Sequence, residues 1–336
     1  MNTATTIYRK IRRHSGYALN DMRGSLGMNK TFFQQARGSR IIVYHGICQE
    51  DPTRFNSLFL LASTFEEHLQ FYQQYFHIVS LDAYYKQQFR SDRFNICITF
   101  DDGFANNFKY VLPLMYKYRI PISFFITSIL ETGYNFLWND YLSFLQQYGP
   151  GQLSLWGDHF NKDRHGRYLS INTGRYLRED LQSTGFDKKN ELIRLLEPSL
   201  SLADKVPDKD YWLQMTRQEI KTLSVSHLAT IGCHGYYHND LGRIPLDDAT
   251  RELALNKRYL EEITRKEIRS LAFPYGSYTR ELATTARSLG FDHLLAQDFL
   301  FPGDHTDETM RERLGVNPYI SVNNQMTAII KGRYLS

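Results

Sequence analysis

The sequence has few cysteines, no long apolar run and little net charge. Its three cysteines, Cys48, Cys97 and Cys233, are far apart and form no CxxC pair, so they indicate no disulfide framework and permit a reducing compartment. The longest apolar stretch, over residues 120–130, is interrupted and is far shorter than the roughly 20 residues of a membrane helix. Lysine and arginine number 40 against 36 acidic residues, too slight an excess to indicate a nucleic-acid-binding protein. We therefore expect no integral membrane segment and no nucleic-acid partner.

The basic N-terminal residues are not followed by an apolar segment. The sequence begins MNTATTIYRKIRRHSGYALN, whereas a secretory signal peptide has roughly 7–15 apolar residues after its positive region. We therefore expect a cytoplasmic protein. The cluster of Arg9, Lys10, Arg12 and Arg13 leaves two interpretations open: a solvated end of the chain, or a short amphipathic contact with an anionic membrane.

Aromatic residues, in contrast, are abundant. The 22 Phe, 23 Tyr and 3 Trp make up 14% of the 336 residues. Chains that cannot bury a core are poor in aromatic residues, so wholesale disorder is excluded. At about 150 residues per domain the length allows two domains, and it equally allows one α/β barrel of roughly 250 residues with an elaboration.

From residue 40 onward, short apolar runs alternate with helical patterns, which is typical of a largely parallel α/β fold. The expected strands are 41–44, 96–100, 122–126, 229–233, 270–273, 291–296 and 314–316. The expected helices are 64–75, with a capping box of Thr64 and Glu67, then 107–118, 216–226, 246–264 and 279–289, the last ending at Gly290.

The alternation lapses in residues 131–210, which are rich in glycine, asparagine, aspartate and lysine. We interpret this segment as an insertion or small helical cap. The predicted organisation is an N-terminal extension (1–38), the first part of a barrel (39–130), the insertion (131–210) and the second part of the barrel (211–330).

Four polar or tight-turn segments come directly after expected strands. They are Tyr44-His45-Gly46, Thr99-Phe100-Asp101-Asp102-Gly103, Cys233-His234-Gly235-Tyr236-Tyr237-His238 and Phe273-Pro274-Tyr275-Gly276. Active sites of parallel α/β barrels lie at the carboxyl ends of the strands, so we expect these segments to meet.

The residue types in these segments favour a metal site. Asp101 and Asp102 would repel each other unless a cation neutralised them, and carboxylates and imidazoles bind divalent ions. His234 and His238 are four residues apart, so one helical turn would put both rings on one face. Two histidines and one carboxylate leave a coordination position open for water, and the second carboxylate could act as base. Taken singly, Asp-Asp-Gly is typical of a turn and HxxxH of a surface face; their order and strand-end placement favour the site.

These motifs resemble those of the polysaccharide deacetylases with a NodB-homology domain, carbohydrate esterase family 4. The first motif of that family, TFDDG, is intact at residues 99–103, and the second matches at His234 and His238. The third motif, Arg-x-Pro-Tyr, appears with Ala272 in place of the arginine, followed by Pro274 and Tyr275. The resemblance covers roughly residues 40–130 and 211–318, and it implies a distorted (β/α) barrel of the NodB-homology type.

The resemblance also implies roles for individual residues. Asp101 would be the general base, and Asp102, His234 and His238 would hold a divalent metal ion, most often zinc. The backbone N–H of Tyr275 would stabilise the oxyanion formed when water attacks an N-acetyl carbonyl. The implied substrate is an N-acetylated glycan or sugar-containing precursor, and the products are acetate and a free amine.

Two departures from the family pattern leave alternatives open. Arg313, just before the expected strand 314–316, is either a substitute for the arginine missing at Ala272 or a solvated loop residue. The late Leu-x-x-His motif that supplies the family's catalytic acid is absent, so the candidates for the acid are His293, His305 and His45.

Three functions therefore compete at this stage. A metal-dependent de-N-acetylase is favoured by the complete set of Asp101, Asp102, His234 and His238. A non-catalytic carbohydrate-binding protein on the same fold is favoured by the missing arginine and acid histidine. An unrelated interaction protein with chance motifs is opposed by the ordered spacing. The insertion is expected to shape the pocket, with Trp138 either stacking on a sugar or packing the insertion onto the barrel.

Overall fold

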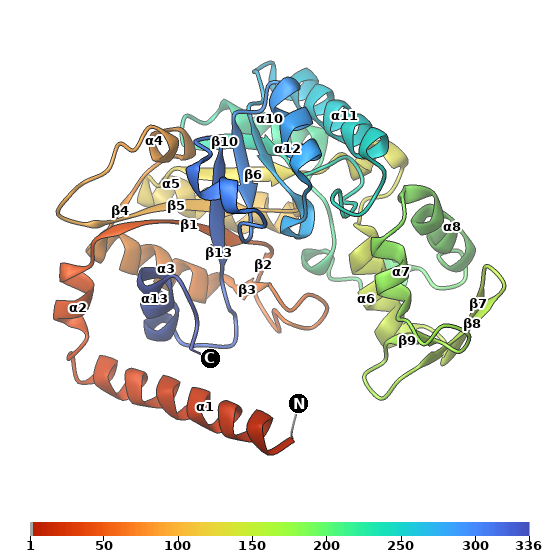
Figure 1. Ribbon diagram of the computed structural model, residues 1–336, viewed down its shortest axis with the longest axis horizontal. Coiled ribbons are helices and arrows are strands. Elements are labelled where there is room, and N and C mark those ends of the chain that lie inside the picture. Colours follow the sequence, from red (N-terminus) through yellow and green to blue (C-terminus); the bar gives the residue numbers. More distant parts are fainter. Residues whose placement is uncertain (1–2, 336) are drawn as a thin grey trace.

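A closed barrel of parallel strands forms the centre of the protein, in a computed structural model that describes residues 3–335 (Figure 1). Around the barrel the strands follow the order β1, β13, β12, β11, β10, β6 and β5, and β5 pairs again with β1 to close the ring. Their bounds are β1 Gly38–Tyr44, β5 Phe94–Phe100, β6 Ile122–Ile126, β10 Ala229–Cys233, β11 Ser270–Ala272, β12 His293–Ala296 and β13 Met310–Gly315. The predicted (β/α) barrel is confirmed.

Strand β5 is the centre of the sheet because it has three neighbours. Its first residues pair with an outlying strand, β4 (Phe76–Ile78), and its last residues pair with β6, while β1 runs along its other side. All these pairings are parallel, so the carboxyl ends of the barrel strands open at one end. The four polar strand-end segments therefore come together there.

The barrel strands are buried on both faces. All seven residues of β5 are buried. Side chains alternate along each strand between a small inner cluster, which includes Ile41, Cys97 and Phe125, and a larger cluster under the surrounding helices, which includes Ile42 and Ile98. This double burial is why most of these strands, though not β13, read as apolar runs in the sequence.

The surrounding helices are α3 (Ala62–Tyr75), α4 (Leu81–Tyr85), α5 (Leu112–Tyr118), α10 (Arg217–Val225), α11 (Leu246–Thr264), α12 (Arg280–Ser288) and α13 (Val322–Lys331). The predicted capping box at Thr64 is wrong: α3 begins at Ala62, after Leu61, without a side-chain cap. A complete capping box occurs instead at Thr216 and Glu219, before α10. The predicted helix over 107–118 starts as a π-helical segment, Asn107–Val111, and continues as α5.

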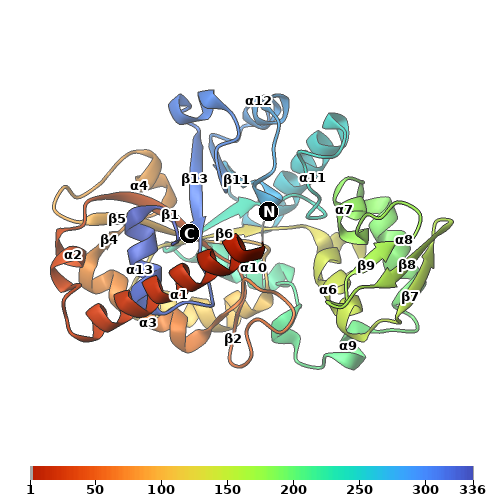
Figure 2. The same ribbon diagram turned by 60° about the horizontal axis from the view of Figure 1, so that its bottom comes forward.

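The insertion forms a separate layered unit beside the barrel (Figures 1 and 2). It contains helices α6 (Trp138–Tyr148), α7 (Leu177–Gln182), α8 (Phe186–Leu196) and α9 (Leu202–Lys205). It also contains an antiparallel sheet of β7 (Gln152–Leu155), β8 (Asp158–Lys162) and β9 (Tyr168–Ser170), so of the two interpretations, an insertion or a small helical cap, the structure fits the insertion. A core of its own, including Tyr141, Leu153 and Trp212, holds the unit together.

The N-terminal extension is helical, with α1 (Thr3–Ser25) followed by α2 (Lys30–Gln35). Figure 2 shows α1 on the outside of the barrel, alongside α13. Two short parallel strands, β2 (Ile47–Cys48) and β3 (Leu60–Leu61), follow β1. Within residues 3–335, no helix has an apolar stretch long enough to cross a membrane.

Candidate active site

Four strand ends place the predicted site residues around one buried point. Asp101 and Asp102 follow β5, His234 follows β10, His45 follows β1, and Tyr275 lies in the turn after β11. The backbone continues the sheet for one more residue: the Asp101 N–H donates to Tyr44 O at 3.0 Å and the His234 N–H donates to Ile126 O at 3.2 Å. These bonds fix the backbone from which the Asp101 and His234 side chains project.

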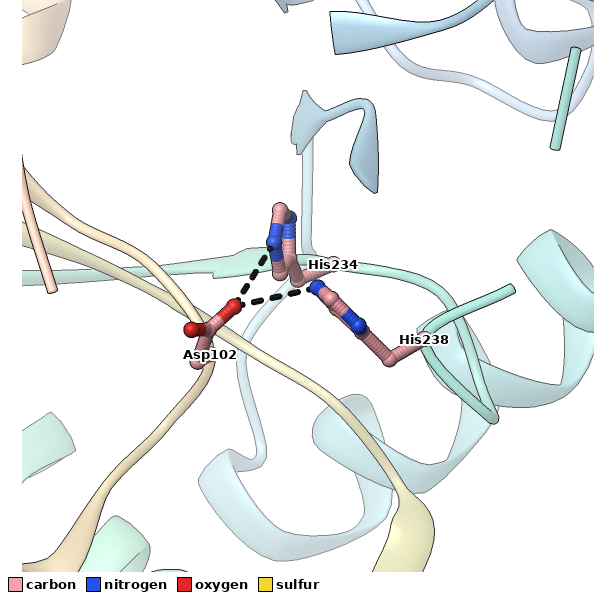
Figure 3. A group of neighbouring side chains, drawn as sticks. All are labelled: Asp102, His234 and His238. Carbon is pink, nitrogen blue, oxygen red and sulfur yellow. Dashed lines mark ion pairs between the residues drawn. The ribbon is translucent and has the colours of Figure 1, made fainter. Parts of the chain in front are cut away.

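Asp102, His234 and His238 form a compact set of ligand atoms (Figure 3). Asp102 Oδ1 lies 3.3 Å from His234 Nε2 and 3.1 Å from His238 Nε2. Within the described chain this oxygen is buried and has no hydrogen-bond partner that meets the usual geometry. An oxygen and two nitrogens that face one another without bonding are the arrangement that a divalent cation would satisfy. The three residues therefore fit a metal ion.

Each imidazole is oriented through its other nitrogen. His234 Nδ1 lies 2.8 Å from Ala272 O, a carbonyl that can only accept, so Nδ1 carries the proton and Nε2 keeps its lone pair for the site. His238 Nδ1 lies 3.3 Å from Tyr275 Oη. Such a bond from the distal ring nitrogen is usual for metal-ligating histidines, since it fixes the tautomer and the ring plane.

The histidine segment is a loop and not the helical turn that the spacing predicted. Gly235 and His238 have φ values of 75° and 58°, in the left-handed region, and Asp102 has a φ of 74°. For a side-chain-bearing residue this conformation costs about 1–3 kcal/mol, so surrounding contacts must compensate. The loop folds the chain back sharply enough to bring both rings to Asp102.

Glu252, in α11, supplies contacts that hold this loop. Its carboxylate accepts a hydrogen bond from the Tyr237 N–H at 3.2 Å and another from Asn239 Nδ2 at 2.6 Å. On the other side Trp138 Nε1 donates to His238 O at 2.9 Å. Trp138 is 1% exposed, so it packs the insertion onto the loop and cannot stack on a sugar.

Asp101 is held by Arg313 and not by the third-motif position, where Ala272 stands. Arg313 Nη1 lies 2.7 Å from Asp101 Oδ1, and Nη2 lies 2.7 Å from Oδ2. The arginine is 5% exposed and belongs to β13, so the alternative of a solvated loop arginine just before a strand is wrong. Strand β13 starts earlier than predicted, at Met310, and its register places Arg313 beside Ile41 of β1.

Charge governs the ionisation of both aspartates. Burial alone would raise the pKa of Asp101, but the Arg313 guanidinium and His234 outweigh burial and lower the pKa below its usual range. For Asp102, the adjacent His238 and His234 likewise outweigh burial and hold the pKa well below the usual range. Both carboxylates are therefore ionised at neutral pH, one paired with a guanidinium and the other facing two imidazoles.

A cavity of about 520 Å³ opens onto these groups. His45, Tyr275 and Arg313 line it together with the metal-ligating set. The insertion, expected from the sequence to shape the pocket, adds four polar side chains to this lining, namely Asn139, Asp140, Ser143 and Arg178.

Asp140 is the most unusual of the added residues. It is 5% exposed, and within residues 3–335 its Oδ2 has no hydrogen-bond partner. Burial, reinforced by the charge of Asp102, raises its pKa well above the usual range. In the sequence, only its place at the start of the insertion related it to the pocket.

Two of the three candidate acids lie elsewhere. His293 is the first residue of β12, at the opposite end of the strand from the site, and stacks on Tyr85 with ring centroids 4.0 Å apart. His305 packs against Phe299 and lines a separate cavity. His45 is therefore the one of the three that lines the site cavity.

Comparisons with known proteins support the fold and the family resemblance. The family model for polysaccharide deacetylase matches residues 208–294, which include both site histidines and the third motif. A search of curated protein sequences gives no match. Over 88% of this chain, the fold is similar to that of a Streptococcus pyogenes deacetylase, PplD in complex with acetate, with 15% identity, a TM-score of 0.57 and 99% of that chain covered.

Two further solved structures are similar over the same share of the chain. IcaB from Ammonifex degensii has 17% identity, a TM-score of 0.53 and 98% of its chain covered. A polysaccharide deacetylase from Bacillus cereus has 14% identity, a TM-score of 0.53 and 69% of its chain covered. These likenesses show a common fold. With the family model, they confirm the resemblance to the polysaccharide deacetylase family and to its NodB-type barrel.

Proposed function

We propose that this protein is a metal-dependent hydrolase that removes N-acetyl groups from a polysaccharide or a sugar-containing precursor. The observation that carries the proposal is the pairing of Asp101 with Arg313 beside a separate Asp-His-His set. A binding protein has no need to keep one ionised carboxylate positioned beside three candidate ligands. The expected products are acetate and a free amine on the sugar.

The metal would be held by Asp102, His234 and His238, whose donor atoms all lie within 4.8 Å of one another. Two imidazoles and one carboxylate suit zinc, with a position left for water or substrate. Bound there, a divalent cation would supply a Lewis acid that polarises the acetyl carbonyl and makes water more acidic.

Asp101 is the residue suited to take the proton from the attacking water. Its carboxylate is ionised and locked by two hydrogen bonds from Arg313, so it has little freedom to rotate away from the water. As negative charge builds on the carbonyl oxygen, the N–H of Tyr275 would donate to it. Tyr275 has a φ of 59°, and the turn that follows β11 places it at the cavity.

The leaving amine also needs a proton. We assign this step to His45, which lines the cavity and is not one of the three ligands. The polar groups from the insertion, Asn139, Ser143 and Arg178, would hydrogen-bond sugar hydroxyls around the reacting N-acetyl group. An N-acetylated glycan is accordingly the expected partner.

The experiment is metal analysis of the purified protein together with acetate release from a panel of N-acetylated glycans. We expect about one divalent ion per chain and acetate release from at least one glycan, lost on chelation and restored by zinc. Full metal occupancy with glycan binding but no acetate release would replace the proposal by the alternative, a non-catalytic carbohydrate-binding protein.

A further inference from the structure

The outward side of helix α1 carries a row of exposed apolar side chains. Tyr8, Ile11, Leu19 and Met22 of α1, and Leu26 just beyond it, are each between 54% and 67% exposed. Their spacing of three, four or eight residues places them on one side of an α-helix. The five residues form an apolar stripe on the outside of the molecule.

The opposite side of α1 is attached to the protein by polar contacts. Asn20 Nδ2 donates to Asn324 Oδ1 at 2.8 Å and to Thr327 Oγ1 at 3.1 Å, both in α13. An ordinary surface helix buries its apolar side against the core and turns its polar side to water. Helix α1 does the reverse, so the apolar stripe is left for something outside the chain.

The charge around the apolar stripe indicates what kind of partner would cover it. Residues 1–38 contain seven lysines and arginines and one acidic residue, Asp21, so this extension carries more net positive charge than the whole chain, which is +4. The side chains of Lys10, Arg12, Arg13 and Arg23 are all exposed. Two more apolar side chains, Met28 and Phe32, continue the exposed apolar surface toward α2, being 58% and 38% exposed.

From this combination we propose that α1 binds in the plane of a bilayer rich in anionic lipid. The apolar stripe would enter the boundary between headgroups and acyl chains, and the basic side chains would pair with the headgroups. Charge complementarity favours a lipid surface over a second copy of this chain, since two equally basic extensions would repel. The inference rests on the N-terminal extension alone and is independent of the proposed hydrolase activity.

The test is co-sedimentation of the full chain with vesicles of phosphatidylcholine alone and of phosphatidylcholine mixed with phosphatidylglycerol. We expect binding to the mixed vesicles that is at least tenfold stronger than to the neutral ones and that weakens as salt is added. Replacing both Arg12 and Arg13 by alanine should weaken binding by about fivefold per residue, the effect expected of a basic side chain near an anionic surface.

A matched pair of variants separates the apolar stripe from general surface effects. Met22→Glu should weaken binding to mixed vesicles by at least tenfold. Val225→Glu makes the same kind of change at a residue that is 77% exposed at the end of α10, and it should bind as the parent does. Thermal melting and size-exclusion chromatography of both variants control for folding.

Equal sedimentation of the parent with neutral and mixed vesicles, or unchanged binding by Met22→Glu, would overturn the proposal. Concentration-dependent dimerisation of the parent without vesicle binding, abolished by Met22→Glu, would also overturn it, because it would assign the apolar stripe to self-association.

Discussion

Arg313 donates two hydrogen bonds of 2.7 Å to the carboxylate of Asp101. This arginine belongs to β13, whereas the third motif of the deacetylase family would place an arginine at the end of β11. Ala272 occupies the β11 position. The barrel permits this exchange because its strands are parallel, so β11 and β13 both end at the end of the barrel where Asp101 lies. What the chemistry requires is a guanidinium at Asp101, whichever strand carries it.

Arg313→Ala is expected to lower turnover by about 10²-fold at neutral pH, since a misplaced base costs that much, while metal content stays at the parent level. Without the guanidinium, burial raises the pKa of Asp101, so the acidic limb of the pH–rate profile should move to higher pH. Metal analysis and pH–rate profiles measure both effects.

In Arg313→Lys the pH profile should lie closer to that of the parent than in Arg313→Ala, because lysine keeps the positive charge. Turnover should recover less, because lysine cannot donate two hydrogen bonds to both carboxylate oxygens of Asp101. Arg311→Ala, on the same strand and in contact with Tyr85, is the matched control and should leave the profile unchanged. Identical profiles for Arg313→Ala and the parent would show that Arg313 does not act on the base.

His234→Ala and His238→Ala are each expected to abolish stoichiometric divalent metal, because each removes one of three protein ligands. The parent should melt at higher temperature with metal than after chelation: ligand at 100 times its Kd stabilises a fold by about 2.7 kcal/mol. The variants should lose this metal-dependent gain. His305→Ala, which alters a separate cavity, is the control and should keep both the metal and the metal-dependent rise in melting temperature. Full metal occupancy in His234→Ala and His238→Ala would exclude the site.

Glu252→Ala is expected to weaken metal affinity by about 10–100-fold, the usual cost of removing a residue that orients ligands. The carboxylate holds the Tyr237 N–H and Asn239 on either side of His238, and without it the left-handed loop loses its support. A competition titration with a chelator measures the affinity. Glu262→Ala, on the exposed side of the same helix, is the control, and equal affinities for the two variants would mean that the loop keeps its shape unaided.

His45→Ala is expected to slow acetate release from an N-acetylated sugar by roughly 10²–10⁴-fold, the contribution of a positioned acid. The same variant should hydrolyse an aryl acetate at a rate much closer to that of the parent, since the leaving group of that substrate departs without needing a proton. The ratio of the two rates is the measurement. An unchanged ratio would move the role to another group in the cavity, for which the buried Asp140 is the first residue to test.

Much of the barrel was predictable because its strands and helices carry strong local signals. The apolar runs at 122–126 and 229–233 and the helical pattern at 246–264 match β6, β10 and α11 to the residue. Strand β13 was predicted too short because Arg311, Glu312 and Arg313 interrupt its apolar pattern. A charged residue such as Arg313 makes a strand segment resemble a loop in the sequence, because its partner, here Asp101, is distant in the chain.

The remaining parts depended on contacts that no local pattern reveals. The HGYYH segment has helical spacing, but the positive φ of His238 is set by Glu252 and Trp138, which are distant in sequence. The small sheet of β7 to β9 was missed because its strands are short, with only alternate residues such as Leu153 and Leu155 facing the insertion's core. Asp140 lines the site because the insertion folds over the barrel. The cytoplasmic location stays a prediction.

The most direct test of the account compares Asp101→Asn with the parent for metal content and acetate release in the same preparations. Asp101 is placed beside the ligands and not among them, so the variant should retain one divalent ion per chain and release acetate about 10²–10⁴-fold more slowly. Asp102→Asn, in contrast, should lose both metal and activity. If Asp101→Asn with full metal releases acetate as fast as the parent, the assignment of Asp101 as the base, and with it the central claim, is contradicted.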